Sequence, residues 1–420
     1  MSADQTNPSE NRSTVQFNPY APGYDANPFP ALEKLRAEAP IFYWDQGRCW
    51  VVSRYEDGLT VLRDDKHFSP NRDDWEFASV LGSDVIVPEM EELNKNGLFA
   101  LGEQNHARVR RLVSPAFTPR ATERLRPEIQ TIVDELLASV AAKGRVNMVH
   151  EFSERIPARV IGSMLKIPTG REQLFHDFTN AVAKSVFAGA LAPEELAPLR
   201  QQIREGIVLV TETIEDRRRN PREDDILTTL IQTEEQGDTL NKQELLALVS
   251  SLIVGGFETT VHLFSFCVYN LLQHPGVFAE VKTRPELIKN LVEEVLRFDN
   301  FVKMGPARYA LEDMELGGMP IKKGQMLVVL VGSALRDERA FDKAGVFDIQ
   351  RNANASIAFG HGAHYCLGAN LARLMAQISM GTLVRRFPEL RLVKQPSFGP
   401  HSLMRKMEVL EVDLGSPSAG

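Results

Sequence analysis

One short stretch of the sequence carries a cysteine in a setting suited to metal chemistry. Cys366 lies in FGHGAHYCLG, directly before a predicted helix, where unpaired backbone N–H groups and the helix dipole favour a thiolate. Gly360, Gly362 and Gly368 allow the backbone to close tightly around whatever the sulfur binds. A zinc site would need further Cys or His ligands at metal spacing, and Cys366 has no CxxC partner. A lone cysteine is usually buried and inert, but a single thiolate in a glycine-rich loop better fits an axial ligand of haem iron.

A second stretch, VSSLIVGGFETTVHLFSF, combines two adjacent glycines and an acid with an otherwise apolar helical pattern. The pattern is apolar around most of the helix, which predicts a buried helix. Gly255 and Gly256 each cost about 1 kcal/mol relative to Ala in a helix, and a buried Glu258 is costly unless it is paired or protonated. From the spacing alone, close helix packing at the glycines and a salt bridge for Glu258 are the favoured interpretation.

Two other motifs place ionisable side chains about one helical turn apart. LVEEVLRFDN contains Glu294 and Arg297 three residues apart on one helix face, a spacing that is usually an exposed pair. HARVRRLV places His106 and Arg110 on the same side of a helix. Arg and His are the donors that buried carboxylates require, so this pair could bind an acidic ligand. A solvated basic face is the alternative.

The elements that must position these residues are mainly helices. From about residue 100 to about residue 300, apolar residues recur every three or four positions, for example in ATERLRPEIQTIVDELLASVAAK, with Gly and Pro breakers between segments. Short strand-like runs such as QMLVVLV follow, and IFYWDQGRCWVVSRY predicts two strands near the start. The stretch from about Phe68 to Ala100 is expected to form loop and short helix. We therefore predict a mainly α fold with a small β portion.

Residues 1–28 are polar and rich in proline, and are expected to form a loosely attached N-terminal arm. No internal repeat or flexible linker divides the remainder, so residues 29–420 are predicted to be a single domain. The net charge of −8 over 420 residues gives no basic surplus for nucleic acid. Three well-separated cysteines, Cys49, Cys267 and Cys366, suit a reducing cytoplasm. No signal peptide or membrane span is expected, and we predict a cytoplasmic monomer.

The cysteine loop also resembles a known motif. Phe359, Gly360, Gly362, Cys366 and Gly368 match the haem-binding signature of the cytochrome P-450 family, the haem-thiolate monooxygenases. The resemblance covers nearly the whole chain. Stretches such as HARVRRLVSPAF, EEVLRFDN and SALRD are similar to bacterial, ferredoxin-dependent members, including a myxobacterial macrolide epoxidase. It implies the cytochrome P-450 fold, with haem b held between the long glycine-bearing helix and the helix after the cysteine loop.

The resemblance also implies roles for individual residues. Cys366 is expected to ligate the iron. Thr259 is expected to hydrogen-bond the oxygen molecule or its water, and Glu258 to relay protons. Residues expected to bind the haem and its propionates are His106, Arg110, Arg308, His364, Phe359, Gly360 and Gly368. A buried structural network, which supports the haem loop, is expected from Glu294, Arg297 and Arg351.

The expected reaction is hydroxylation or epoxidation of a lipophilic molecule: a fatty acid, polyketide or macrolide, terpenoid or aromatic. A largely apolar wall that admits more than one class of guest is predicted. Its candidate residues are Trp75, Phe77, Val85, Leu98, Ala183, Val254, Gly255, Phe257, Met304, Leu403 and Met404.

Electrons are expected from NAD(P)H through a ferredoxin reductase and a ferredoxin. Arg108, Arg111 and Arg373 are predicted to form a positive face on the cysteine side of the haem, which would attract an acidic ferredoxin. Solvated helix arginines without such a role are the alternative. Two other functions stay open: a haem-thiolate peroxygenase or isomerase that needs no reductase, and a haem sensor without turnover. Peroxygenase members of the family typically lack the acid–Thr pair, which is present here.

Overall fold

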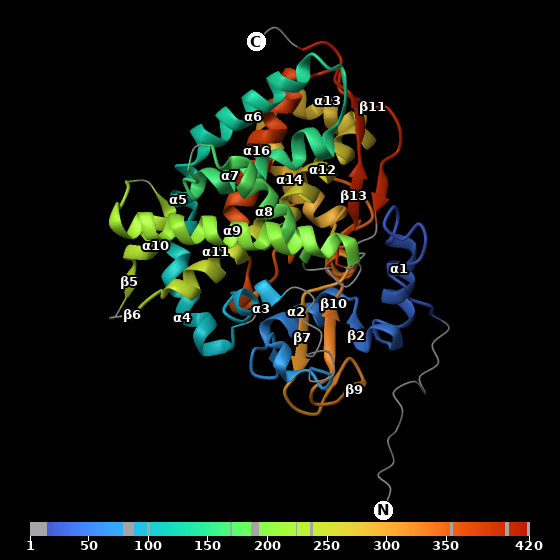
Figure 1. Ribbon diagram of the computed structural model, residues 1–420. Coiled ribbons are helices and arrows are strands. Elements are labelled where there is room, and N and C mark those ends of the chain that lie inside the picture. The colour runs from blue at the N-terminus through green and yellow to red at the C-terminus, as the bar shows by residue number, and fades with distance from the viewer. Residues whose placement is uncertain are drawn as a thin grey trace, which may run out of the picture.

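The computed structural model describes residues 15–78, 88–98, 101–168, 170–185, 193–223, 225–235, 238–352, 356–399 and 403–417. Helices form the larger part of the molecule, and a five-stranded sheet lies at one end (Figure 1). The α-helices are α1 (Phe29–Glu38), α2 (Tyr55–Arg63), α3 (Pro88–Lys95), α4 (Glu103–Val113), α5 (Pro119–Glu123), α6 (Arg126–Ala141), α7 (Arg155–Met164), α8 (Glu172–Ser185), α9 (Pro193–Arg219), α10 (Ile226–Gln232), α11 (Lys242–Gly256), α12 (Glu258–Gln273), α13 (Pro275–Thr283), α14 (Ile288–Phe298), α15 (Val331–Ala334) and α16 (Ala369–Arg386). Short 3-10 turns are η2 (Asp45–Gly47), η3 (Arg72–Asp74), η4 (Ser114–Phe117), η7 (Pro285–Leu287) and η8 (Gly362–His364), and η5 (Val149–Ser153) is a π-helical turn.

The main sheet joins strands from both ends of the chain. Its order is β1-β2-β10-β7-β3, and β10 runs parallel to β2 whereas the other pairs are antiparallel. A three-stranded sheet has the order β11-β14-β4. The strands are β1 (Ile41–Trp44), β2 (Cys49–Val52), β3 (Phe68–Ser69), β4 (Arg145–Asn147), β5 (Glu234–Glu235), β6 (Asp238–Thr239), β7 (Ala307–Ala310), β8 (Met314–Leu316), β9 (Met319–Ile321), β10 (Met326–Val329), β11 (Arg391–Leu392), β12 (Ser397–Gly399), β13 (Lys406–Val409) and β14 (Glu411–Asp413).

These elements confirm the predicted mainly α fold with a small β portion. The two strands expected near the start are β1 and β2, which pair antiparallel around the short turn η2. The largest hydrophobic core lies among the helices, and a second core lies between the main sheet and α2. This division follows from the sequence, because apolar residues at a helical period fill most of the middle of the chain.

The predicted long glycine-bearing helix is two helices. A capping box starts α11, in which the side chains of Asn241 and Glu244 each accept a hydrogen bond from the other residue's backbone N–H. α11 ends at Gly256, and α12 begins at Glu258, because Phe257 between them adopts φ −84° and ψ −73°. A Cβ at Gly256 would lie only 3.3 Å from Ile161 Cδ1 of α7, so glycine permits this close crossing.

Within the described part of the chain, residues 242–273 are the one helical stretch that is long and apolar enough to cross a membrane. In its most apolar window, 61% of the residues are buried inside the molecule. Such burial is what a core helix requires.

Residues 15–28 are not loosely attached, which corrects the expectation for this part of the N-terminal arm. Val15, Phe17 and Tyr24 are buried, and they form a third hydrophobic core with Trp44 and other residues of the sheet region. Residues 1–14 lie outside the described residues. The arm was expected to be loose because its composition is polar, but three well-spaced apolar side chains are enough to anchor it.

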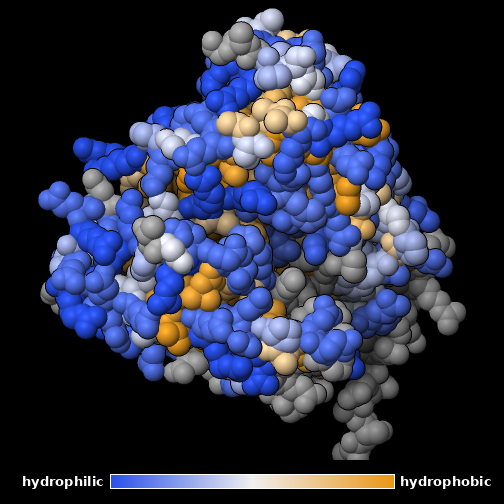
Figure 2. All heavy atoms as spheres, turned by 45° about the horizontal axis from the view of Figure 1, so that its top comes forward, coloured by the Kyte–Doolittle hydropathy of each residue, from blue (hydrophilic) through white to orange (hydrophobic). Residues whose placement is uncertain are grey.

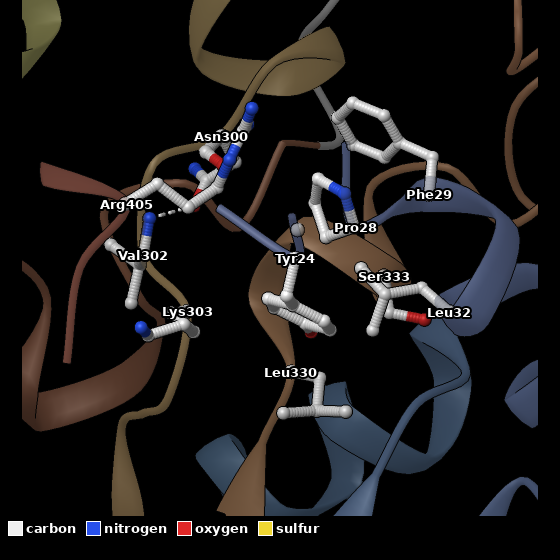
Figure 3. A pocket seen from close by; sticks show the side chains of 11 residues that line it. Tyr24, Pro28, Phe29, Leu32, Asn300, Val302, Lys303, Leu330, Ser333 and Arg405 are labelled. Carbon is white, nitrogen blue, oxygen red and sulfur yellow. Dashed lines mark hydrogen bonds between the residues drawn. The ribbon is translucent and has the colours of Figure 1, made fainter. Parts of the chain in front are cut away.

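Buried charges also hold this segment in place. Lys303, whose side chain is 1% exposed, lies 3.0 Å from the carboxylate of Asp25. Arg405 donates to the backbone carbonyl of Asp25 at 2.8 Å and to the carboxylate of Asp299 at 2.5 Å. Figure 3 shows Lys303, Arg405 and Tyr24 around a small pocket between this segment and the core. The segment is therefore part of the folded body of the protein.

Candidate functional site

The loop that carries Cys366 is held tightly by its own backbone and by α2. The N–H of Cys366 donates to the carbonyl of Phe359 at 2.9 Å, which closes the loop around η8. Gly362 adopts φ +70°, and a Cβ at this position would lie 2.9 Å from the carbonyl oxygen of Leu62 at the end of α2. Gly360 adopts φ +76° with more room around it, and a Cβ at Gly368 would meet nothing within 4 Å. The close approach expected of all three glycines is therefore observed at Gly362.

The sulfur of Cys366 lies at the start of α16, as predicted. Burial raises the pKa of its thiol, and this effect outweighs the backbone N–H groups of Gly368 and Ala369 and the charges of Arg110 and Arg373, which lower it. The N–H groups at the helix start lower the pKa of the Cys366 thiol, as expected. Without a further positive charge, however, the opposing effect of burial is larger. A coordinated metal ion supplies such a charge and deprotonates a thiol outright.

Four basic side chains from three distant parts of the chain meet beside this loop. The ring of His106 on α4 stacks on the ring of His364 with centroids 3.9 Å apart. Arg110, one turn further along α4, contacts the carbonyl oxygen of Tyr365. Burial, and then the neighbouring basic groups, lowers the pKa of His106 to about 4 and that of His364 to about 3. Arg308 on β7 is among those groups, so the cluster favours a negatively charged ligand.

Arg308 shows that this cluster suits the carboxylates of haem. The residue is only 4% exposed, and its Nη1 donates to the backbone carbonyl of Ala307 at 2.9 Å. Its Nε is buried without a hydrogen-bond partner in the described chain. The one acid whose charge acts on its pKa is Asp65. A buried guanidinium requires acceptors, and the two propionates of a haem would supply them.

The break between α11 and α12 exposes a short piece of helix backbone. The hydroxyl of Thr259 donates to the carbonyl oxygen of Gly255 at 2.5 Å, and both residues are partly exposed. Phe257 and Thr260 are buried on the opposite side of the break. α12 packs on α16, the helix that follows Cys366, so the break belongs to the same helical layer as the cysteine loop.

Glu258 at the first turn of α12 has a titratable neighbour on the same helix. Its carboxylate Oε1 lies 4.0 Å from Nε2 of His262, one turn further along. The side chain of Glu258 is 19% exposed, and that of His262 is 2% exposed. The acid therefore lies between the solvent and a buried histidine.

Glu294, Arg297 and Arg351 lie together in the interior. Arg297 Nη2 donates to Glu294 Oε1 at 2.7 Å, and Arg351 Nε lies 3.5 Å from Glu294 Oε2. Arg297 Nε donates to Glu294 Oε2 at 2.8 Å, and Nη1 and Nη2 also donate to the backbone carbonyls of Leu335, Ala344 and Val346. The spacing alone favoured an exposed pair, but the side chains of Glu294 and Arg297 are buried. Their network connects α14 to the segment that precedes the cysteine loop.

The predicted positive face is largely neutralised within the chain. Arg108 is paired with Asp238 at 3.1 Å and with Glu244. Arg373 is held by Glu293 of α14 at 2.6 Å, by the hydroxyl of Tyr365 at 3.0 Å, and over the ring of Phe359 at 4.3 Å. Arg111 is exposed. Two of the three arginines are therefore structural, and the expectation of a shared positive face is wrong for them.

Some candidate residues of the substrate wall lie near the break. Leu98 is buried, and its N–H donates to the hydroxyl of Ser251 on α11 at 3.1 Å. Val254 and Gly255 are partly exposed at the end of α11. Phe257 is buried in the helical core. Val85 and the side chain of Ala183 lie outside the described residues.

Trp75 and Phe77 lie elsewhere. Trp75 contacts Phe77 edge-on at 5.6 Å and Tyr309 of β7 at 6.4 Å, and Arg48 lies over Phe77. Successive side chains of a strand point to opposite faces, so these rings lie on the face of β7 opposite Arg308. The described contacts of both rings are therefore with each other, with Tyr309 of β7 and with Arg48, and their place in the substrate wall stays a prediction.

The late candidates have different surroundings. Met304 is buried in the third hydrophobic core with Phe17 and Trp44. Leu403 is 41% exposed, and its carbonyl accepts hydrogen bonds from the N–H groups of Lys303 and Met304. Met404 forms a β-bridge with Val302 and packs against the helical core.

Three residues beside the predicted site residues were not predicted from the sequence: His262, Glu293 and Leu62. His262 stands four residues after Glu258, and this i,i+4 spacing was a visible signal. Glu293, which holds Arg373, is adjacent to Glu294 and was not distinguished from it. The contact between Gly362 and Leu62 has no local signal, because only the fold brings α2 to the cysteine loop.

Comparisons with known proteins agree with this arrangement. The family model described as Cytochrome P-450 matches residues 21–406. The epothilone C/D epoxidase of Sorangium cellulosum is 44% identical over 422 residues, which cover 100% of both chains. The mycinamicin IV hydroxylase/epoxidase of Micromonospora griseorubida is 35% identical over 351 residues, which cover 82% of this chain and 83% of that protein.

The fold is also that of a solved relative. The structure of epothilone B-bound P450epoK superposes with a TM-score of 0.89 at 44% identity, and the match covers 95% of this chain and 99% of that one. The predicted similarity to a myxobacterial macrolide epoxidase is therefore confirmed in sequence and in structure.

Proposed function

Because this chain belongs to the cytochrome P-450 family of haem-iron monooxygenases, we propose that it inserts one oxygen atom from O2 into a macrolide-type substrate, with electrons from NAD(P)H that arrive through a ferredoxin. The inserted atom would hydroxylate a C–H bond or epoxidise a double bond. A thiolate-ligated haem iron supplies the activation of O2 when it is bound. The contribution of the chain is to bind that group, orient the substrate and deliver protons.

The proposed cofactor is haem b, with Cys366 as the ligand of its iron. His106, Arg110, Arg308 and His364 would bind the propionates. The observation that carries this proposal is the buried Nε of Arg308, which has no acceptor in the described chain and lies within a cluster of basic groups. Propionates would supply the missing acceptors and would raise the depressed pKa values of the two histidines.

Thr259 and Glu258 are proposed to handle protons at the break between α11 and α12. The Oγ1 proton of Thr259 rests on the carbonyl of Gly255, so the same hydroxyl can accept a second hydrogen bond and pass a proton on. Glu258 is partly exposed and can exchange protons with solvent. The acid–hydroxyl pair favours a monooxygenase that draws on O2 over a peroxygenase or an isomerase, which does not need proton delivery to O2.

The macrolide class is proposed from two observations. The relatives at 44% and 35% identity act, by their names, on epothilone C/D and mycinamicin IV. Leu98 and Val254 near the break are apolar, and apolar burial contributes about 25 cal/mol per Å² whatever the identity of the guest. A wall of this kind selects by size and shape, which suits a large, weakly polar ring.

A ferredoxin is proposed as the electron donor. Asn370 at the start of α16 donates to the carbonyl of Phe117 at 3.2 Å, so η4 and α5 lie on the cysteine side of the molecule. Arg111, Arg120 and Arg124 are exposed on this region. Exposed arginines attract an acidic donor. The face seen in the space-filling view is mainly hydrophilic, with hydrophobic patches between the hydrophilic residues (Figure 2).

The test combines the purified haem protein with a surrogate ferredoxin, its reductase, NADH and a panel of macrolides, fatty acids, terpenoids and flavonoid-like aromatics. We expect macrolides to give the largest spin-state shift and an oxygenated product whose yield depends on NADH and O2. Equal product from hydrogen peroxide without the reductase would instead indicate a peroxygenase. Ligand binding without any turnover across the panel would indicate a sensor.

A further inference from the structure

We propose that His262 is a positioning residue for Glu258: it holds the carboxylate of Glu258 beside the break and shares a proton with it. This inference rests on the proposed function of Glu258 in proton delivery. It adds a second titratable group to that step, one turn further along α12.

The geometry of α12 brings the two side chains together. Residues four apart lie on the same helix face, and Glu258 Oε1 and His262 Nε2 are 4.0 Å apart. A small rotation of the carboxylate closes this distance to a hydrogen bond, which needs about 2.9 Å. The imidazole itself has little freedom, because its ring lies 5.9 Å from that of Phe301 and is 2% exposed.

This arrangement gives the two residues different tasks. Glu258 is the partly exposed member of the pair and can exchange protons with water. His262 is enclosed by protein and can therefore hold the carboxylate without competition from solvent. A carboxylate and an imidazole this close titrate as a coupled pair rather than as independent groups. The charge of Glu258 then depends on the protonation of His262.

Other charged groups on the elements around α12 are engaged elsewhere. Phe301 and Phe266, with ring centroids 6.2 Å apart, lie between His262 and Arg405. Charged pairs on the neighbouring elements include Arg405–Asp299, Arg373–Glu293, Arg297–Glu294, Lys143–Glu151 and His150–Glu154. Glu258 Oε1 approaches Nε2 of His262 to 4.0 Å.

The first test measures the pair without turnover. The protein has nine histidines, and ¹⁵N-histidine labelling of the diamagnetic ferrous–CO holoenzyme resolves them by NMR. His262→Gln identifies the resonance. We expect Glu258→Gln to lower the titration midpoint of His262 by about one pH unit, because an opposite charge at this distance favours the protonated ring. An unchanged midpoint in Glu258→Gln would overturn the proposal.

The second test measures product formed per NADH between pH 6 and pH 9. We expect His262→Gln and Glu258→Gln each to reduce this ratio several-fold and to flatten its pH dependence. The double variant should be no worse than either single variant, because contacting residues are not additive. A wild-type ratio and pH profile in His262→Gln would contradict the inference.

His274 provides the matched control. It caps the end of α12, its Nδ1 lies 2.9 Å from the carbonyl oxygen of Asn270, and its ring stacks on Phe347 at 4.3 Å. His274→Gln should leave the ratio and the pH profile unchanged; a change equal to that of His262→Gln would reveal a general effect on the helix and overturn the proposal. If Glu258→Gln itself keeps the wild-type ratio, the proposed relay fails, whereas the NMR midpoint still decides whether the pair exists.

Discussion

The hydroxyl of Thr259 donates a 2.5 Å hydrogen bond to the carbonyl oxygen of Gly255, across the break that separates α11 from α12. The bond satisfies a carbonyl that the interrupted helix leaves at its end. It also fixes the side chain of Thr259 so that its oxygen stays at the break. The hydroxyl proposed to handle protons thus also has a structural task.

Thr259→Ala removes that hydroxyl, and with it both the hydrogen bond to Gly255 and the proposed role in proton delivery. We expect haem and substrate to bind normally, while product per NADH falls roughly tenfold or more, since positioned proton transfer contributes about 10²–10⁴-fold. The reduced oxygen should appear as hydrogen peroxide. Thr259→Ser keeps the hydroxyl and should retain most of the product yield. Product at the wild-type ratio in Thr259→Ala would show that this hydroxyl moves no proton.

The three cysteines differ in their surroundings, which predicts which of them can bind a metal. Burial raises the pKa of the Cys49 thiol to about 12 and raises that of Cys267 as well. Cys366 alone among them receives N–H groups at a helix start. We expect Cys366→Ala to abolish the thiolate-type CO difference spectrum, while Cys49→Ala and Cys267→Ala retain it. A thiolate spectrum in the Cys366 variant would refute its role as the ligand.

The buried pair of Arg297 and Glu294 predicts a large stability effect. Removing one member of a buried ion pair costs about 3–5 kcal/mol, so Glu294→Gln should lower the urea midpoint markedly and speed the loss of haem. Arg284 and Glu280 supply the control, because they form an exposed pair at 2.9 Å. Arg284→Ala should cost about 1 kcal/mol or less. Similar midpoints for the two variants would mean that the buried network adds no more than a surface pair.

Asp25 predicts that the N-terminal segment stabilises the whole fold. Asp25→Asn leaves the charge of Lys303 buried without its counter-charge, and we expect a loss of about 3–5 kcal/mol. The double variant Asp25→Asn/Lys303→Met should recover part of it. Asp313→Asn breaks an exposed pair with Lys322 and serves as the control. Thermal unfolding measures all of them, and equal melting temperatures for Asp25→Asn and the wild type would show that this buried pair does not stabilise the fold.

The exposed arginines near α5 predict how the electron donor is recognised. Arg120→Glu/Arg124→Glu should slow reduction by an acidic ferredoxin several-fold at low salt, and the difference should shrink as salt screens the charges. Reduction by dithionite should not change. Arg108→Glu is the comparison, because Arg108 is paired within the chain and its loss should affect stability rather than the salt dependence. An unchanged ferredoxin rate in the double variant would remove this region from the docking surface.

The sequence predicts the helices because burial of one face imposes a repeat of three and four, which needs no knowledge of partners. The break at Phe257 has no such signal. The apolar pattern runs through it, and the close contact of Ile161 with Gly256 is made by a different helix. Arg373 pairs with Glu293, which lies 80 residues away in the sequence. The local sequence pattern predicts an arginine exposed to solvent and contains no signal for this pairing.

The family motifs predicted more of the site residues than the helical periodicity did. Arg110 and Tyr365 are 255 residues apart, and only the family signature indicated that their segments serve one ligand. The N-terminal segment shows the opposite case. Its polar composition predicted a loose arm, whereas Val15 and Phe17 are individually buried. Single buried side chains of this kind produce no periodic pattern in the sequence. A prediction from composition alone therefore treats the segment as exposed.

The stack of His106 on His364 has a consequence for how the protein is made. α4 leaves the ribosome roughly 10 to 50 s before the cysteine loop, given the 255 residues between Arg110 and Tyr365 and a synthesis rate of about 5–20 residues per second. Strand β2 likewise can pair with its parallel partner β10 only after β10 has been synthesised. The cofactor site is incomplete until the cysteine loop has been synthesised, so a ribosome stalled before Cys366 should carry a haem-free polypeptide.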